Sequence, residues 1–372
     1  MKILFLTNIP SPYRVDFFNE LGKSSDLTVL FEKATSDERD LSWKEYRFES
    51  FKGVFLKGIS ISTDSAVCVG LKKYLSDKSF DKIICSNFSS PTGISAIFYM
   101  KRKDIPYFLE ADGGVAKKGK GFKEHLKRKI ISGAKGYFST SKPCDDYFIA
   151  YGAKKENIYR YPFTSLNASD ILDKPLSLPK KQRIRKKLKI EESSVVVSVG
   201  RFSYMRGYGK GYDTLFKVCE TLPKNIGIYI IGDEPTDEFV KWKNDKNLDR
   251  LHFVPFKLKS ELFEYYRAAD VSVLLSRGEA WGLVINESMA NGTPVIATDA
   301  CVGALELIKD GVNGYIVSVD SPEQVKNRIA DFLTSKDKQK TMPLAAIETI
   351  KNFTIEKMSI SHINSLKEIF GA

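Results

Sequence analysis

Two glutamates that stand eight positions apart are the residues of this sequence best suited to chemistry on a small ligand. Gly278 directly precedes Glu279, and Gly282 lies between Glu279 and Glu287. Backbone can approach a ligand closely at such glycines, because no side chain intervenes. Carboxylates there accept hydrogen bonds from the hydroxyl groups of a sugar or a nucleoside. Two exposed acids on an ordinary helix would show the same spacing, so the acids alone leave both interpretations open.

A second set of residues could hold phosphate. Gly200 and Arg201 follow an apolar run typical of a buried strand, and Lys210 precedes a predicted helix over residues 212–219. Arginine presents a rigid fork to phosphate oxygens, lysine a point charge, and a helix N-terminus a partial positive charge. We therefore expect this segment to bind a diphosphate.

Predicted strands and helices position both sets. Apolar runs at residues 271–275 and 295–297 predict buried strands on either side of the glutamates, with a loop and a short helix between them. Strand and helix patterns alternate along the chain, which predicts an α/β protein with parallel sheets covered on both faces. Ligands bind at the carboxyl ends of the strands in such sheets, where Glu279 and Glu287 fall.

The segment from Ser276 to Ala290 resembles the E-x7-E motif of the retaining family 4 glycosyltransferases of GT-B fold. Arg201 and Lys210 are similar to that family's Gly-Arg…Lys-Gly pattern, and residues 310–314 resemble it as well. The resemblance implies two Rossmann-like domains facing a cleft. It places an acceptor-binding domain at 1–165 with the C-terminal helix 355–372, a linker at 166–192, and a donor-binding domain for the nucleotide sugar at 193–354.

The resemblance also implies roles for individual residues. Glu279, Arg201 and Lys210 would be catalytic, with the two cations stabilising the departing diphosphate, and Glu287 would hold the ribose. Attack on the same face as the leaving group is expected, with the leaving phosphate taking the acceptor proton. UDP is the expected nucleotide, and because no D-x-D triplet occurs, neither a metal nor another cofactor is expected. The donor-binding residues would be Gly200, Arg201, Lys210, Phe256, Lys257, Leu258, Glu279, Ala280, Trp281, Gly282, Leu283 and Glu287.

An acceptor-side set is expected near the N-terminus. Glu110, Asp112 and Gly113 follow a predicted strand at 106–109, and Arg14 enters the first predicted helix. The acids could orient acceptor hydroxyls, and Arg14 could meet an anion. Loop acids and a surface arginine are the alternatives. Many similar proteins carry a histidine in this region, whereas this sequence has none nearby, so no general base is assigned.

Residues 117–135 form the most basic run of the chain. Phe122, Leu126, Ile130 and Ile131 recur within it at helical spacing, which predicts a basic amphipathic helix. Contact with an anionic membrane surface would contribute about 1 kcal/mol per well-placed lysine. A helix with a solvated cationic face is the alternative. Nucleic-acid binding is not expected, because no aromatic stacking platform accompanies the lysines.

Composition sets the outer limits. A chain of 372 residues predicts two domains, and a net charge of +12 favours anionic partners. The 5 cysteines are scattered without a metal-binding spacing, so a reducing, cytoplasmic setting is expected, with a peripheral position at the inner face of the membrane as an option. No apolar run is long enough to span a membrane, and residues 1–9 predict a buried strand rather than a signal peptide.

We therefore expect a retaining hexosyltransferase that moves a sugar from a UDP-sugar to a saccharide acceptor, lipid-linked, in the synthesis of a surface polysaccharide such as a capsule. Two alternatives stay open. A membrane-surface or nucleic-acid binding protein without catalysis would leave Glu279 and Glu287 unexplained. A GT-B phosphorylase or epimerase disagrees with the Gly-Arg…Lys-Gly pair and with the lack of a recognisable pyridoxal-phosphate lysine site.

Overall fold

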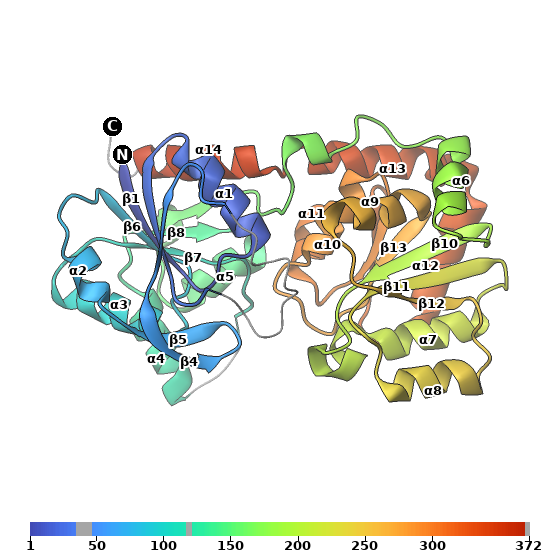
Figure 1. Cartoon of the computed structure of the whole chain (residues 1–372), viewed down its shortest axis with the longest axis horizontal. Coiled ribbons are helices and arrows are strands. Elements are labelled where there is room, and N and C mark those ends of the chain that lie inside the picture. Colours follow the sequence, from blue (N-terminus) through green and yellow to red (C-terminus); the bar gives the residue numbers. More distant parts are fainter. Residues whose placement is uncertain (35–46, 117–120, 369–372) are drawn as a thin grey trace. The chain divides into compact units, whose positions relative to one another are not determined.

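The computed structural model of the chain describes residues 1–34, 47–116 and 121–368. It divides into two compact units, which we call unit 1 (Met1–Ser165 and Thr354–Ala372) and unit 2 (Leu166–Phe353). The sequence analysis placed the corresponding domain boundaries at residue 165 and before residue 355. Each unit is built on its own parallel sheet, as expected for the α/β class (Figure 1).

The sheet of unit 1 has seven parallel strands in the order β3-β2-β1-β6-β7-β8-β9. Its central strand β1 is apolar from Ile3 to Leu6, and Ile3, Leu4 and Phe5 are 0% exposed, because helices cover both faces of the sheet. The strands are β1 (Lys2–Thr7), β2 (Asp26–Phe31), β3 (Lys52–Phe55), β6 (Lys82–Cys85), β7 (Phe108–Glu110), β8 (Gly136–Ser139) and β9 (Ile158–Arg160). An antiparallel hairpin, β4 (Lys57–Ser62) and β5 (Ser65–Val69), stands beside this sheet.

The helices of unit 1 begin at local signals in the sequence. Ser90 and Ser141 accept hydrogen bonds from the backbone N–H groups of Gly93 and Cys144, and a proline stands in the first turn of both helices. The helices are α1 (Pro12–Gly22), α2 (Leu71–Leu75), α3 (Pro91–Arg102), α4 (Phe122–Ile131), α5 (Lys142–Ala150) and α14 (Ile355–Glu368), with a 3-10 turn at Lys155–Asn157.

Helix α14 brings the C-terminal end of the described chain into unit 1. It packs against α1, as Figure 1 shows. Met358, His362 and Leu366 lie at helical spacing along its buried face and are each 0% exposed. A histidine that is remote in sequence thereby enters the core of unit 1.

The sheet of unit 2 has six parallel strands in the order β12-β11-β10-β13-β14-β15. The strands are β10 (Ser194–Val199), β11 (Ile226–Gly232), β12 (Leu251–Pro255), β13 (Val271–Leu274), β14 (Val295–Thr298) and β15 (Gly314–Val317). The helices are α6 (Leu178–Lys187), α7 (Tyr212–Thr221), α8 (Asp237–Asp245), α9 (Lys259–Ala268), α10 (Leu283–Ala290), α11 (Val302–Leu307), α12 (Pro322–Thr334) and α13 (Lys336–Ile350), with 3-10 turns at Ala168–Asp170 and at η4 (Tyr204–Lys210).

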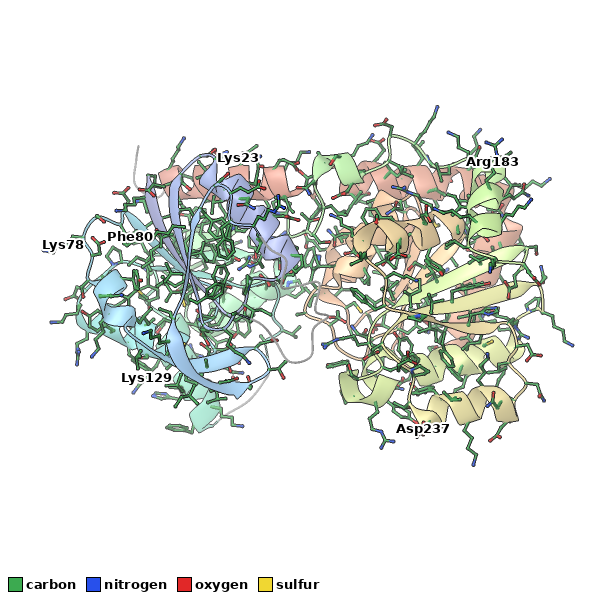
Figure 2. The ribbon with its side chains drawn as sticks, viewed as in Figure 1. Lys23, Lys78, Phe80, Lys129, Arg183 and Asp237 are labelled. Carbon is green, nitrogen blue, oxygen red and sulfur yellow. The ribbon has the colours of Figure 1, made fainter. Side chains whose placement is uncertain are left out.

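Residues 166–192, for which the sequence predicted a linker, form part of unit 2. Helix α6 packs against α9, and buried Arg185 donates hydrogen bonds to the carbonyls of Ala268 and Ser193. The lysine-rich composition that suggested a linker lies on the outer side of this helix, where Arg183 points away from the ribbon in Figure 2.

The strand order of each sheet contains a point at which the chain reverses direction across the sheet. In unit 1 this point lies between β1 and β6, and in unit 2 between β10 and β13. Loops leave such neighbouring strands toward opposite faces, so a crevice opens at their carboxyl ends, and ligands of α/β proteins bind there. In unit 2, the predicted loop of Gly200, Arg201 and Lys210 follows β10, and the predicted loop of Glu279 follows β13.

Several elements carried no signal in the sequence analysis: the hairpin β4–β5, strands β3 and β15, and helices α2 and α8. Strand β4 is exposed along its whole length, so it lacks the buried apolar pattern of the sheet strands. None of the helices in the described parts of the chain combines the length and apolar character that crossing a bilayer requires.

Candidate functional site

An ion pair between Lys210 and Glu279 lies at the carboxyl edge of the unit 2 sheet. The Lys210 Nζ atom is 2.5 Å from a carboxylate oxygen of Glu279, and the side chains are 17% and 23% exposed. The Ser276 hydroxyl donates to the same oxygen at 3.3 Å. The loops after β10 and β13 therefore meet, and they bring a cation and a carboxylate together at a partly open position.

Gly200 is required where the chain leaves β10. A Cβ atom at this position would lie 2.9 Å from the Tyr212 hydroxyl oxygen and 3.3 Å from side-chain carbons of Lys210. Gly200 thus lies directly beside the Lys210 side chain, and Arg201 is the next residue along the chain. Gly200 and Lys210, two of the predicted diphosphate residues, meet close to Tyr212, the first residue of α7.

The Tyr212 hydroxyl is a buried polar atom for which the described part of the structure provides no hydrogen-bond partner. The tyrosine is 1% exposed, and burial raises its pKa far above the ordinary value, with Asp233 and Glu279 adding to the shift. A buried hydroxyl without a partner is costly, and ligands or water commonly satisfy such groups. No pattern in the sequence pointed to this residue, because a tyrosine at the start of a helix carries no distinctive signal.

Backbone hydrogen bonds fix the loop that carries Glu279. The Glu279 N–H donates to the Ala300 carbonyl at 3.1 Å, and the Glu279 carbonyl accepts from the Val302 N–H at 3.1 Å. Gly282 precedes α10 with φ of +93°, a conformation that side chains rarely adopt. Ala280 is exposed, while Gly282 and Leu283 are half-buried, so backbone along this loop remains accessible.

Trp281 lies in the same loop, but its side chain belongs to the core. It is 2% exposed, and its indole N–H donates to the Asn286 side chain at 2.8 Å. Trp281 therefore stabilises the loop from within. Only its backbone is suited to the donor contact that the sequence analysis assigned to residues 280–283.

Glu287 lies in the second turn of α10, half-buried, and accepts a hydrogen bond from the Tyr266 hydroxyl at 3.4 Å. Tyr266 is 0% exposed. Burial raises its pKa well above the ordinary value, and nearby Glu287 and Tyr212 add to the shift. Tyr266 therefore stays a neutral hydrogen-bond donor that orients the Glu287 carboxylate from the buried side.

The remaining residues that the sequence predicted to bind the donor lie elsewhere on the same sheet edge. Phe256 and Leu258 follow β12 and are 45% and 52% exposed, and Lys257 lies between them, 3.9 Å from Glu261. Strand β11 separates β12 from β10. The structure thus places Phe256, Lys257 and Leu258 two strands away from the group formed by Gly200, Lys210 and Glu279.

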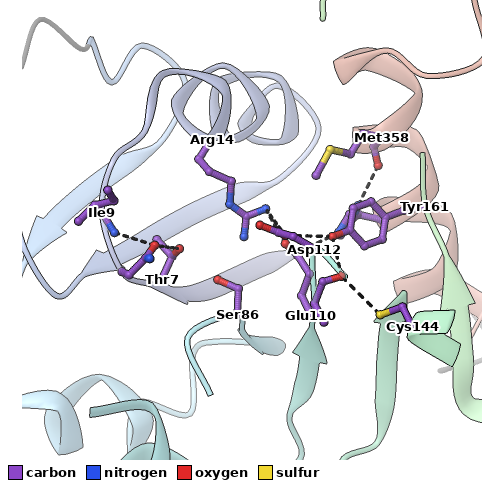
Figure 3. Close-up of polar contacts among 12 residues, drawn as sticks. Thr7, Ile9, Arg14, Ser86, Glu110, Asp112, Cys144, Tyr161 and Met358 are labelled. Carbon is purple, nitrogen blue, oxygen red and sulfur yellow. Dashed lines mark hydrogen bonds and ion pairs between the residues drawn. The ribbon is translucent and has the colours of Figure 1, made fainter. Parts of the chain in front are cut away.

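In unit 1, the predicted acceptor residues form a buried charged network (Figure 3). The Arg14 guanidinium is 2.5 Å from a carboxylate oxygen of Glu110 and 3.9 Å from one of Asp112. The Tyr161 hydroxyl lies 3.3 Å from the same oxygen of Asp112. Arg14 is 3% exposed, so the anions that it meets are carboxylates of the chain itself, rather than the bound anion that the sequence suggested.

His362 completes this network from α14. Its Nε2 atom is 3.0 Å from Glu110, its Nδ1 atom is 2.8 Å from the Met358 carbonyl, and its ring stacks on Phe138. The sequence analysis found no histidine near Glu110, because His362 is 252 positions away in the chain. Only the fold reveals this contact.

The charged groups of the network shift one another's pKa values. Burial alone would raise the pKa of Glu110, but the Arg14 charge and the His362 hydrogen bond outweigh that effect and lower it. Burial likewise opposes the charged form of Arg14, yet Glu110 and Asp112 raise its pKa. Glu110 is 0% exposed and is committed to these partners, whereas the Asp112 side chain is 37% exposed and Gly113 is half-buried. Of the two acids, Asp112 is the one that an acceptor can reach.

The basic run is only partly covered by the described residues, since residues 117–120 lie outside them. Helix α4 buries Ile130 and Ile131 as expected, but Phe122, its first residue, is 82% exposed. Lys123 and Lys129 are exposed, and Lys129 lies at the surface of unit 1 in Figure 2. Within the described ranges, no group of three or more His, Cys, Asp or Glu residues is placed to hold a metal ion.

Comparisons with known proteins agree with this architecture. Residues 180–349 match the family described as "Glycosyl transferases group 1". The D-inositol 3-phosphate glycosyltransferase of Xylanimonas cellulosilytica is 30% identical over 192 residues, which are 50% of this chain and 45% of that protein. The chain spans about half, or less, of the length of the first curated relatives that it matches.

Solved structures match over nearly the whole chain. Anabaena Alr3699/HepE, solved in complex with UDP, superposes with a TM-score of 0.78 at 19% identity and covers 99% of this chain and 100% of its own. Sucrose-phosphate synthase from Thermosynechococcus elongatus gives a TM-score of 0.78 at 17% identity, with 100% of both chains covered. Residues 180–349 are thus similar to the glycosyl transferases group 1 family, and the chain has the GT-B fold.

Proposed function

We propose that this chain is a retaining glycosyltransferase that transfers a sugar from a UDP-sugar to a saccharide acceptor. The observation that carries the proposal is the Lys210–Glu279 pair at the point where the strand order of unit 2 reverses. A cation, a carboxylate, a glycine and a helix N-terminus converge there, which is the set of groups that a sugar diphosphate requires. The complexes of Anabaena Alr3699/HepE with UDP and with UDP-glucose support UDP as the nucleotide.

Each group has a defined part in this proposal. Arg201 and Lys210 bind the diphosphate, Glu279 accepts hydrogen bonds from the sugar hydroxyls, and Glu287 accepts them from the ribose. Because Lys210 already contacts Glu279, the donor enters a site whose charges are held in place before binding. The Tyr212 hydroxyl, which lacks a partner in the described structure, is the donor available to an additional oxygen.

The reaction breaks the bond between the anomeric carbon and the diphosphate oxygen. That bond's electron pair leaves with the diphosphate, so negative charge grows where Arg201 and Lys210 are placed. The acceptor hydroxyl attacks from the face that the diphosphate leaves, its proton passes to the leaving phosphate, and the anomeric configuration is retained. No metal is required in this scheme, because two side-chain cations and the α7 N-terminus meet the charge.

The acceptor binds unit 1 in this proposal, beside Asp112 and Gly113. The buried ion pair of Arg14 with Glu110 holds the loop that carries them. We propose a lipid-linked saccharide of a surface polysaccharide as the acceptor. Helix α4, with exposed Lys123, Lys129 and Phe122, would rest on the anionic cytoplasmic face of the membrane.

Turnover with a panel of sugar nucleotides tests the proposal. We expect release of UDP from one UDP-sugar in the presence of a saccharide acceptor, and NMR of the new glycoside should show the anomeric configuration of the donor. The Glu287→Ala variant is the control for contaminating activity. An inverted product would refute the retaining mechanism, and failure to turn over or bind any sugar nucleotide would refute the proposed function.

Vesicle sedimentation tests the membrane contact separately. Wild-type protein should sediment with vesicles that contain phosphatidylserine and release from them as salt is raised. A Lys123→Glu, Lys129→Glu double variant should sediment less, whereas a Lys224→Glu, Lys246→Glu control, at exposed lysines of unit 2, should sediment as wild type. Equal binding of all three proteins would refute a role for α4.

A further inference from the structure

We infer that Arg277 is a positioning residue for the donor diphosphate: it joins three loops of unit 2 and so holds Lys210 in place. The inference rests on the proposed function, and it adds a residue to which no donor contact or catalytic step has been assigned. It is carried by hydrogen bonds of the Arg277 guanidinium and backbone, all within unit 2.

Every N–H donor of the Arg277 guanidinium meets an oxygen of the chain. Two donate to the Asp213 carboxylate at 2.8 and 2.7 Å, and one donates to the Tyr208 carbonyl. The remaining two face Asp320, at 3.2 Å from Nε and 2.5 Å from Nη2. Because a guanidinium has five such donors, none is left for a substrate. Arg277 therefore acts through its neighbours and does not touch the donor.

These partners come from different loops at one edge of the sheet. Tyr208 and Asp213 flank Lys210, Asp320 follows β15, and Arg277 itself follows β13. The backbone adds a further link, since the Arg277 N–H donates to the Gly209 carbonyl at 3.0 Å. Residues on both sides of Lys210 in the sequence therefore contact Arg277: Tyr208 and Gly209 before it, and Asp213 after it.

The loop that Arg277 holds is conformationally unfavourable. Met205 and Arg206 both adopt left-handed backbone angles, with φ of +49° and +54°, and Gly207 follows at +87°. Non-glycine residues persist in this region only where surrounding contacts enforce it. On the far side, the Asp233 carboxylate accepts from the N–H groups of Phe202 and Ser203. Arg277 and Asp233 therefore hold the loop from its two ends.

The spacing between the loops leaves little room for movement. A Cβ atom at Gly211, where φ is +69°, would lie 2.1 Å from the Leu275 carbonyl oxygen. Gly211 is the N-cap residue of α7, so the same close approach places the helix N-terminus beside the Arg277 loop. If the guanidinium were removed, the left-handed segment could relax, and both Lys210 and the α7 N-terminus would lose their alignment with a diphosphate.

Two measurements test this inference: the binding of UDP compared with that of uridine, and amide hydrogen exchange of the loop. Affinities of wild type, Arg277→Ala and Arg277→Lys for UDP and for uridine would be measured by calorimetry. Amide hydrogen exchange of residues 202–213 would be followed by mass spectrometry without ligand. Arg328→Ala is the matched control, because it also removes an arginine of unit 2 that pairs with a carboxylate, Asp310, but lies outside these loops.

For Arg277→Ala we expect at least tenfold weaker binding of UDP, uridine affinity within twofold of wild type, and faster exchange in residues 202–213. Arg277→Lys should also bind UDP more weakly than wild type, because an ammonium offers three donors in place of the five-donor planar fork. Arg328→Ala should match wild type in every measurement. Should Arg277→Ala not fold, Asp320→Asn, which weakens two of the five contacts at a 53% exposed acid, takes its place with a smaller expected effect in the same direction.

Unchanged exchange in residues 202–213 would overturn the idea that Arg277 holds this loop. Faster exchange with unchanged UDP affinity, or an equal loss of UDP and uridine, would overturn its role in positioning the diphosphate. If the wild type binds none of UDP, GDP and ADP, the proposed function fails. The exchange measurement would still report separately whether Arg277 holds the loop.

Discussion

Replacing Lys210 with methionine separates the stability of unit 2 from its proposed chemistry. The change removes the ammonium and keeps a side chain of similar length. Glu279 then loses its ion-pair partner at 2.5 Å but keeps the hydrogen bond from the Ser276 hydroxyl. Leaving a partly buried carboxylate with one partner fewer should cost about 1–3 kcal/mol, which a protein with stability on the order of 5–15 kcal/mol tolerates.

The expected loss of turnover is larger than this loss of stability. Removing one donor that stabilises developing negative charge costs roughly 3–4 kcal/mol, so kcat should fall by about 100- to 1000-fold. The double variant Lys210→Met, Glu279→Gln removes the unpaired charge as well. It should recover stability without recovering turnover, because the cation is still absent.

The assay is release of UDP from the UDP-sugar that the wild type uses, with denaturant unfolding measured in parallel. Lys338→Met is the matched control, since Lys338 forms an ion pair of the same length, 2.5 Å, with Asp331 in the same unit. The control should keep wild-type kcat. A Lys210→Met enzyme that retains a third or more of wild-type kcat would refute the reasoning.

Three further outcomes follow. Glu287→Ala should weaken UDP binding tenfold or more, while affinity for 2′,3′-dideoxy-UDP stays as in wild type; equal losses for both ligands would argue against a ribose contact. Glu110 has a lowered pKa in the folded protein, so its contribution to stability is present above the ordinary glutamate pKa of about 4.3 and is lost as pH falls through the folded value. Denaturant unfolding between about pH 7 and pH 3 should therefore show Glu110→Gln less stable at neutral pH but less sensitive to acid, and parallel curves would contradict the network. Saturating EDTA should leave turnover nearly unchanged, and a strict need for added Mg²⁺ or Mn²⁺ would count against charge stabilisation by Arg201 and Lys210 alone.

The sequence was most informative where physical requirements are local. Buried parallel strands need continuous apolar runs, and β1, β10 and β13 formed where such runs were found. Glycines at close approaches were similarly readable, since Gly282 adopts positive φ before α10. The α/β class and the parallel sheets could therefore be predicted before any coordinates.

Contacts between distant segments could not be predicted from local patterns. His362 was one residue of the predicted C-terminal helix, yet it hydrogen-bonds Glu110. Arg14 was expected at the surface or at an external anion, but the fold buries it against the chain's own acids. Arg277 had no role beyond a resemblance until its five donors were matched with acceptors on other loops. In each case the deciding partner lies far along the chain.

Composition also misled in one region. The prolines and the basic run between residues 166 and 192 suggested a linker, because exposed charge is common to linkers and to surface helices. Helix α6 differs from a linker by two basic side chains that turn inward, Arg185 and Lys181, which donate to the carbonyls of Ala268, Ser193 and Ala269. Because most basic residues of this segment are exposed, the sequence alone does not show which of them are buried.

A crystal structure of the protein soaked with UDP would show whether unit 2 holds the nucleotide as proposed. We expect diphosphate density within hydrogen-bonding distance of Arg201 and Lys210, and ribose hydroxyls within reach of the Glu287 carboxylate. UDP bound elsewhere on the chain, or a diphosphate that contacts neither cation at full occupancy, would contradict this expectation.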